Sequence, residues 1–149
     1  MYEIRTILLT TDFSDTSLKA LDPARALAKR FGARIVLVYV EEDRLPPLVV
    51  EYMAVGVEDV LHQQVDRAKV RLAEFARQHL AGFEDVEPIV AVGTPHVEIV
   101  RLAEEKAVDL IVMATHGRGF ISHAILGSTA ERVLRRAPCP VMITREPVV

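Results

Sequence analysis

Short hydrophobic runs alternate with longer amphipathic segments along the whole chain. Five of the runs are rich in apolar and β-branched residues, and they lack the alternation of a half-buried strand. Such runs are typical of strands that are buried on both faces of a sheet. The strands expected from this pattern are residues 6–10, 35–40, 86–92, 109–114 and 141–144. Pro88 interrupts the third run early, which favours a position at the edge of the sheet.

The segments between the runs carry apolar residues every three or four positions, which predicts helices. In the first segment Ser14 is a natural N-cap, Gly32 is a natural end, and Pro23 is expected to kink the helix between them. Thr94 and Pro95 are expected to begin another helix, as its cap and its first residue. The remaining helices are predicted at residues 58–80 and 128–136.

The resulting order is β-α-β-α-β-α-β-α-β, which predicts a parallel sheet with helices on both faces. In such folds a ligand binds beyond the carboxyl ends of the strands, where the winding direction of the chain reverses. A ligand site is therefore expected in the loops at residues 10–14 and 115–128, which follow the first and fourth strands.

Residues 43–57 contain two prolines and a glycine and are expected to be mostly loop. The segment nevertheless carries five large apolar side chains: Leu48, Val49, Val50, Tyr52 and Met53. The simplest interpretation is that they pack over the edge of the core. The alternatives are a lid over a site and a contact in a dimer.

The composition limits the class of protein. A chain of 149 residues has the size of one domain, and a net charge of -3 gives no basic surface for nucleic acid. The single cysteine, Cys139, cannot form an internal disulfide, which predicts a reducing, cytoplasmic location. No signal peptide is visible, and no apolar run approaches the ~18 residues that span a bilayer. Neither nucleic acid nor membrane is therefore expected as a partner.

The segment after the fourth strand carries the candidate chemistry. Gly117 and Gly119 would let backbone N–H groups approach a ligand, because no Cβ stands in the way. Residues 127–129, Gly-Ser-Thr, open a helix whose free N–H groups and dipole favour an anion. The guanidinium of Arg118 would add a charged contact to phosphate oxygens. Together these residues predict a phosphate-binding cradle.

Each candidate also has a simpler structural interpretation. Ser128 and Glu131 have the spacing of a capping box, and the two glycines could serve only as turn residues. Asp12 either caps a turn beside Ser14 or accepts a hydrogen bond from a nucleoside. His116 either packs within its loop or contacts phosphate, where it could act as a general base.

The spacing of this segment resembles that of the universal stress protein family, whose nucleotide-binding members carry Gly-x-x-Gly-x9-Gly-Ser/Thr. Here residues 114–117 read Ala-Thr-His-Gly, and nine residues separate them from Gly127 and Ser128. The resemblance extends to the first loop, to the fourth strand, and to Ala-Pro-Cys-Pro-Val at residues 137–141. It therefore covers essentially the whole chain.

The resemblance implies one α/β domain over residues 1–149, Rossmann-like and similar to the adenine nucleotide alpha hydrolases. Its five-stranded parallel sheet would have the order 3-2-1-4-5. The implied function is that of a homodimeric stress-response protein that binds ATP, AMP or ADP, with or without Mg. The last strand would pair the two copies through Val141, Met142, Ile143 and Thr144.

Carried over residue by residue, the resemblance implies that Asp12 meets the nucleoside, and that Val40 and Met113 line the adenine pocket. Gly117 and residues 127–129 would hold ribose and phosphates. With the residues singled out above, the candidate nucleotide site comprises Thr10, Thr11, Asp12, Val40, Met113, Ala114, His116, Gly117, Arg118, Gly119, Gly127, Ser128 and Thr129.

Ala114 departs from the family pattern, because it stands where the motif has its first glycine. If this position required a positive φ, alanine would cost on the order of 1 kcal/mol. If the position only ends the strand, alanine is harmless. The continuous run of residues 113–115 favours the second interpretation.

No residue is expected to be catalytic. The chain lacks the Gly-x-Ser-x-Gly elbow, the P-loop, and the His-x-Gly-His signature of related nucleotidyl transferases. The leading hypothesis is a nucleotide-binding signalling module with at most weak ATPase activity. Two alternatives stay open, a slow ATP hydrolase or nucleotidyl-transfer enzyme, and a dimerisation module without nucleotide.

The remaining histidines lack metal-ligand spacing and are expected on the surface or on helix faces: His62, His79, His96 and His123.

Overall fold

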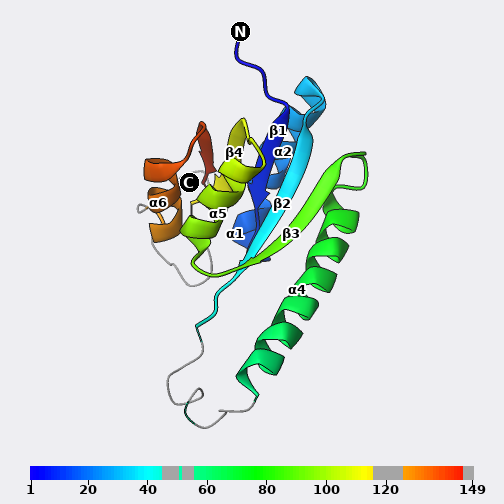
Figure 1. The fold of residues 1–149 in the computed structure, drawn as a ribbon. Helices are drawn as coiled ribbons and strands as arrows, with labels where there is room; N and C mark the ends of the chain where they lie inside the picture. The colour runs from blue at the N-terminus through cyan, green and yellow to red at the C-terminus, as the bar shows by residue number, and fades with distance from the viewer. Residues whose placement is uncertain (45–50, 52–55, 116–125, 146–149) are drawn as a thin grey trace.

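Five parallel strands form one sheet in the order β3-β2-β1-β4-β5 (Figure 1). The structure is a computed structural model, and it describes residues 1–44, 51, 56–115 and 126–145. The strands are β1 Thr6–Thr10, β2 Arg34–Glu41, β3 Val86–Val92, β4 Leu110–Ala114 and β5 Val141–Thr144. The helices are α1 Asp15–Leu18, α2 Leu21–Phe31, α4 Val57–His79, α5 Pro95–Glu105 and α6 Ser128–Arg136. The α/β class and the strand order are those that the sequence predicts.

The winding direction of the chain reverses between β1 and β4. From β1 the chain winds outward through β2 to β3, and it then returns to place β4 on the other side of β1. β5 pairs with β4 and forms the second edge of the sheet. As the sequence predicts, β3 lies at the other edge. Pro88 has no backbone N–H, and at an edge strand this missing donor does not interrupt the hydrogen bonding in the centre of the sheet.

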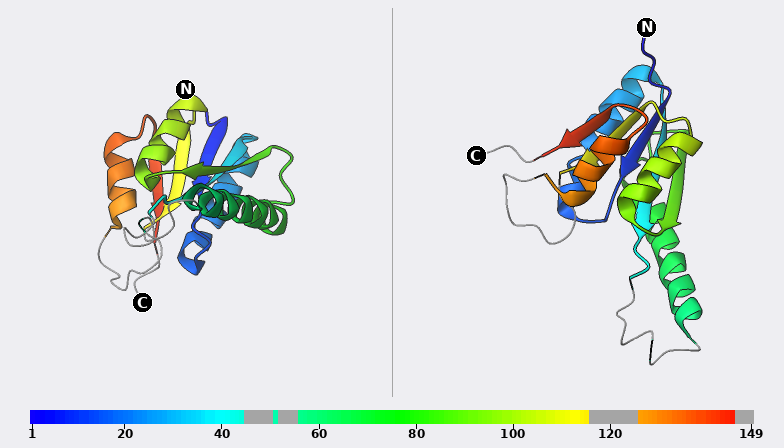
Figure 2. Two further views of the ribbon diagram at one scale, coloured as in Figure 1. Left: turned by 60° about the horizontal axis from the view of Figure 1, so that its bottom comes forward. Right: turned by 60° about the vertical axis from the view of Figure 1, so that its left-hand side comes forward.

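Successive residues of the central strands pack into two separate cores. Ile7 and Leu9 of β1 pack with residues of α2 and α4 on one face of the sheet. Leu8, between them, packs with residues of α5 and α6 on the other face. Figure 2 shows these helices in layers on either side of the sheet. Burial of both faces explains why the strands are continuously apolar.

The first helical segment is two helices, which corrects the expectation of one kinked helix. Pro23 has no N–H and its ring crowds the carbonyl four residues earlier, which belongs to Lys19. The chain therefore ends α1 and begins α2 so that Pro23 falls in the first turn, where its missing donor costs nothing. Both predicted ends are confirmed, because the Ser14 hydroxyl accepts from the Ser17 N–H and Gly32 has a φ of 65°.

Thr94 and Pro95 begin α5 as predicted, although the Thr94 side chain makes no capping hydrogen bond.

The apolar side chains of the predicted loop at 43–57 belong to residues 48–50, 52 and 53, which lie outside the described residues. Within the part of the chain that the structure describes, no helix is both long and apolar enough to cross a membrane.

Candidate functional site

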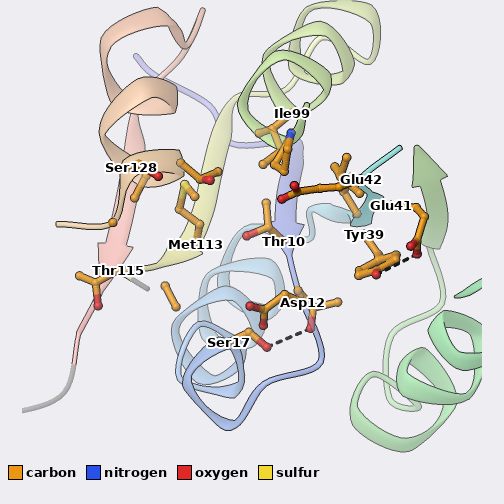
Figure 3. A pocket seen from close by; sticks show the side chains of 18 residues that line it. Thr10, Asp12, Ser17, Tyr39, Glu41, Glu42, Ile99, Met113, Thr115 and Ser128 are labelled. Carbon is orange, nitrogen blue, oxygen red and sulfur yellow. Dashed lines mark hydrogen bonds between the residues drawn. The ribbon is translucent and has the colours of Figure 1, made fainter. Parts of the chain in front are cut away.

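A cavity of about 460 Å³ opens at the carboxyl ends of β1, β2 and β4 (Figure 3). It lies where the winding direction reverses, which is the place that the topology predicts for a ligand. Its volume is in the range of roughly 300–1,000 Å³ that is typical of small-molecule sites. The first turns of α5 and α6 complete its wall with Pro95, Ile99 and residues 128–130.

Nine of the thirteen predicted site residues line this cavity. They come from three strand ends and one helix start, and they are Thr10, Thr11, Asp12, Val40, Met113, Ala114, Gly127, Ser128 and Thr129. The other four, His116, Gly117, Arg118 and Gly119, lie outside the described residues. The sequence therefore identified residues that are far apart in the chain and close in space. Their roles toward a ligand stay predictions.

Asp12 makes the turn that the structural interpretation predicts. Its Oδ1 accepts hydrogen bonds from the backbone N–H of Ser14, at 2.9 Å, and from the Ser14 hydroxyl. The neighbouring Thr11 hydroxyl accepts from the Phe13 N–H at 3.0 Å and lies 3.0 Å from the Ser17 hydroxyl. Asp12 also lines the cavity, so its structural role and a role toward a ligand are compatible.

The start of α6 differs from the predicted capping box. Gly127 occupies the cap position and Ser128 is the first helical residue, so the Ser128 side chain caps nothing. The carboxylate of Glu131 pairs with Arg135 one turn further along, at 3.0 Å, and does not bend back to the cap. A glycine at the cap explains the difference, because the capping box needs Ser or Thr at that position.

The N–H of Gly127 is engaged, which corrects the expectation that it is free for an anion. It donates to the carbonyl of Thr115 at 2.8 Å. The first intrahelical bond runs from the Glu131 N–H to the Gly127 carbonyl. The N–H groups of residues 128–130 therefore have no intrahelical acceptor, and these residues stand at the cavity wall. The positive end of the helix dipole is directed at the same place.

Ala114 is the last residue of β4 and pairs with Thr144 of β5. Among the described residues, only Phe13 and Ala107 combine a side chain with a positive φ. Ala114 therefore has ordinary strand geometry, which confirms that alanine ends the strand without backbone strain.

Half of the described lining was not among the thirteen residues named from the sequence. These residues are Ser17, Val38, Tyr39, Glu41, Glu42, Pro95, Ile99, Thr115 and Ala130. The rule that ligands bind at carboxyl ends of strands could have identified Glu41 and Glu42, since they follow Val40 directly. Pro95 and Ile99 carry no such signal, because their place depends on how α5 crosses the sheet.

The wall formed by β1 and β2 is acidic. Glu42 projects toward the middle of the cavity beside Thr10, while Glu41 turns toward Tyr39, whose hydroxyl donates to it at 2.9 Å (Figure 3). With Asp12 these are the three charged side chains in the described lining, and that lining contains no Lys or Arg. The cavity thus has an acidic wall and, opposite it, a helix N-terminus.

His96 lies on a helix face, as one form of the expectation has it, but that face is buried and not on the surface. The side chain belongs to α5 and is only 9% exposed, next to Pro95 of the cavity wall. Burial lowers the pKa of His96, and the positive charges of Arg132 and Arg136 on α6 lower it further. The imidazole is therefore neutral near pH 7.

Within residues 1–44, 51, 56–115 and 126–145, no three histidine, cysteine, aspartate or glutamate side chains are grouped so that they could hold a metal ion. The described lining offers a ligand apolar contacts, backbone donors and a few carboxylates.

A sequence model of the universal stress protein family matches residues 3–145. The chain is 34% identical to universal stress protein MJ0531 of Methanocaldococcus jannaschii over 144 residues, which are 95% of this chain and 82% of that protein. The structure of the protein MJ0577 of the same organism is similar with a TM-score of 0.82 and 28% identity, and the match covers 100% and 99% of the two chains. A universal stress protein solved in complex with cAMP is similar with a TM-score of 0.60 and 29% identity, over 96% and 98% of the chains.

Proposed function

The chain belongs to the universal stress protein family, and we propose that it binds an adenine nucleotide, ATP or AMP, in the cavity at the carboxyl ends of β1, β2 and β4. The observation that carries the proposal is the pairing of a helix N-terminus with an acidic and apolar wall across one cavity. The similar protein that was solved with cAMP supports the same class of ligand.

The phosphates would lie against α6. Residues 128–130 supply three backbone N–H groups without an intrahelical acceptor, and the helix dipole adds to their attraction for an anion. Gly127 has no side chain, which leaves room for phosphate oxygens close to the backbone. Arg118 and Gly117, which the sequence predicts as further phosphate contacts, remain part of the proposal.

The nucleoside would lie against β1 and β2. Carboxylates repel phosphates but accept hydrogen bonds from ribose hydroxyls and from an exocyclic amine, so Asp12 and Glu42 orient the ligand. Val40 and the buried side chains of Ile99 and Met113 supply apolar contacts for a flat base. The charge distribution therefore orients the nucleotide, with its phosphates at α6 and its nucleoside at β1 and β2.

An Mg ion would accompany the nucleotide rather than reside in the protein. Mg typically keeps several water ligands and is bound by phosphate oxygens with one or two carboxylates. In the proposed orientation the carboxylates of the described lining face the nucleoside, so phosphate oxygens and water would supply the Mg ligands.

We also propose that two copies pair through β5. This strand forms one edge of the sheet, so its outer side presents unpaired backbone groups. Met142 on the strand and Leu134 on α6, the helix that precedes it in the chain, are exposed apolar residues. A pairing of these edges would cover both features.

The binding proposal is tested by thermal unfolding with ATP, ADP, AMP and, for comparison, GTP. A ligand at a hundredfold excess over its Kd stabilises the folded state by about 2.7 kcal/mol, so adenine nucleotides should raise the melting temperature. Failure of all three adenine nucleotides at millimolar concentration would contradict binding and favour the nucleotide-free dimerisation module. Phosphate release that Asp12→Ala abolishes would favour the slow hydrolase instead.

A further inference from the structure

Phe13 has a backbone conformation that its side chain disfavours. Its φ is 65°, in the left-handed region that a bulky residue rarely adopts and that glycine adopts freely. The residue follows Asp12 directly and lies inside the turn closed by the bond from the Ser14 N–H to Asp12. A glycine would form this turn without strain, so the phenyl ring must be held by contacts elsewhere.

Three side chains hold the ring. Its centroid is 4.7 Å from that of Tyr39 on β2 and 6.0 Å from that of Phe75 on α4, the second pair edge to face. The guanidinium carbon of Arg71, also on α4, stands 4.3 Å from the ring centroid. Aromatic pairs and a cation over a ring face are both attractive arrangements. Phe13 thus joins the first loop to the long helix α4.

The left-handed turn sends two neighbouring side chains to different places. Asp12 lines the main cavity, whereas Phe13 packs against the core on the α2 and α4 side of the sheet. Phe13 also borders a small hollow between β2 and α4, together with Tyr39, Arg67 and Arg71. Because one peptide links the two residues, fixing the ring limits the directions that the Asp12 carboxylate can take.

We propose that Phe13 is a positioning residue of the nucleotide site, whose ring, anchored on α4, holds the turn that presents Asp12 to the ligand. The inference rests on the proposed function. Phe13 touches no ligand in this arrangement and acts only through Asp12. It also gives α4 a role in the site, although α4 contributes no residue to the described lining of the cavity.

A double-mutant cycle with ATP binding as the readout tests the proposal, using the full chain and isothermal titration calorimetry. Phe13→Gly removes the ring and also the backbone strain, so the variant is expected to fold. We expect it to bind ATP about tenfold more weakly than the wild type, which is about 1.4 kcal/mol. In an Asp12→Asn background the same change should cost little further affinity, because the residue it positions is already altered. Phe13→Tyr keeps the ring and should retain wild-type affinity.

Leu80→Ala is the matched control for general destabilisation. Leu80 is buried in the same core and caps the C-terminal end of α4, and the ring contacts of Phe13 come from Tyr39, Arg71 and Phe75. This variant should melt at a lower temperature and bind ATP with unchanged affinity at temperatures where it is folded. An equal loss of affinity in Leu80→Ala and Phe13→Gly would overturn the proposal.

Three further outcomes separate this inference from the proposed function. If the wild type binds ATP and Asp12→Asn weakens binding, but Phe13→Gly binds normally, only the inference fails. Only the inference fails as well if the double variant loses affinity by the product of the two single losses, because Phe13 and Asp12 then act independently. If the wild type does not bind ATP, the proposed function itself fails, and the inference fails with it.

Discussion

The backbone N–H of Gly127 donates a hydrogen bond to the carbonyl of Thr115, with 2.8 Å between nitrogen and oxygen. The N–H of Thr115 in turn donates to the carbonyl of Thr144 at the end of β5. The start of α6, the end of β4 and the end of β5 are thereby joined through main-chain atoms. Side-chain substitutions at Gly127 and Ser128 can therefore test ligand binding without removing these bonds.

Gly127→Val should abolish nucleotide binding while the fold is retained. The backbone of Gly127 has φ -59° and ψ 149°, which valine adopts readily, so strain is not expected. The added side chain would occupy the cavity wall where phosphates are proposed to lie. Melting curves with and without ATP measure both effects. Gly82→Ala is the control, because a Cβ there meets open space. Equal nucleotide-induced shifts in the wild type and Gly127→Val would contradict the phosphate site.

Ser128→Ala should weaken nucleotide binding by about 1 kcal/mol, through loss of a hydroxyl contact to phosphate. The stability of the free protein should stay unchanged, because Gly127 and not Ser128 is the cap of α6. Ser14→Ala provides the contrast, since the Ser14 hydroxyl does cap α1 and its loss should cost about 1 kcal/mol of folding free energy. Titration calorimetry and urea unfolding give the two quantities. Unchanged affinity in Ser128→Ala would remove this hydroxyl from the site.

The free energy of unfolding should fall as the pH falls below about 6.5 because of His96. Burial and the charges of Arg132 and Arg136 lower the pKa of this histidine in the folded state. The unfolded chain therefore binds a proton at a higher pH than the folded chain, so stability is full above the unfolded pKa and is lost progressively below it. Urea unfolding between about pH 7 and about pH 5 measures the slope.

His96→Gln should flatten that pH dependence, because the residue no longer titrates. His62→Gln, at an exposed histidine of α4, is the matched substitution control. A slope that is identical in the wild type and His96→Gln would show that other groups cause the loss of stability.

Met142→Glu should convert the proposed dimer to a monomer. The side chain is exposed on the edge strand β5, and a charge buried in a strand-to-strand contact without a partner is costly. Light scattering coupled to size-exclusion chromatography gives the mass directly. Val70→Glu is the control, because Val70 is also apolar and exposed but lies on α4, which packs against β2 and β3 toward the edge of the sheet opposite β5. A wild type that elutes as a monomer would contradict the pairing.

The pattern of residues determined the strands, their parallel arrangement and the end of the sheet at which the candidate site lies, while the strand order was implied by the family resemblance. The central strands β1, β2 and β4 are buried on both faces, so a continuous apolar run identifies each of them without knowledge of its neighbours. The turn chemistry of Ser14, Gly32 and Asp12 is likewise local, because each residue satisfies backbone groups only a few positions away.

Only the tertiary structure decided what depends on residues distant in the chain. The pattern of α5 does not say that His96 is buried near the charges of Arg132 and Arg136 on α6. Nor does the sequence say that Glu42 turns into the cavity while Glu41 turns to Tyr39. The strained backbone of Phe13 is tolerated only because β2 and α4 bring three partners to its ring. Local sequence fixes the conformations that are available, and packing between distant segments selects among them, because burial and side-chain contacts contribute free energies of the same size as local preferences.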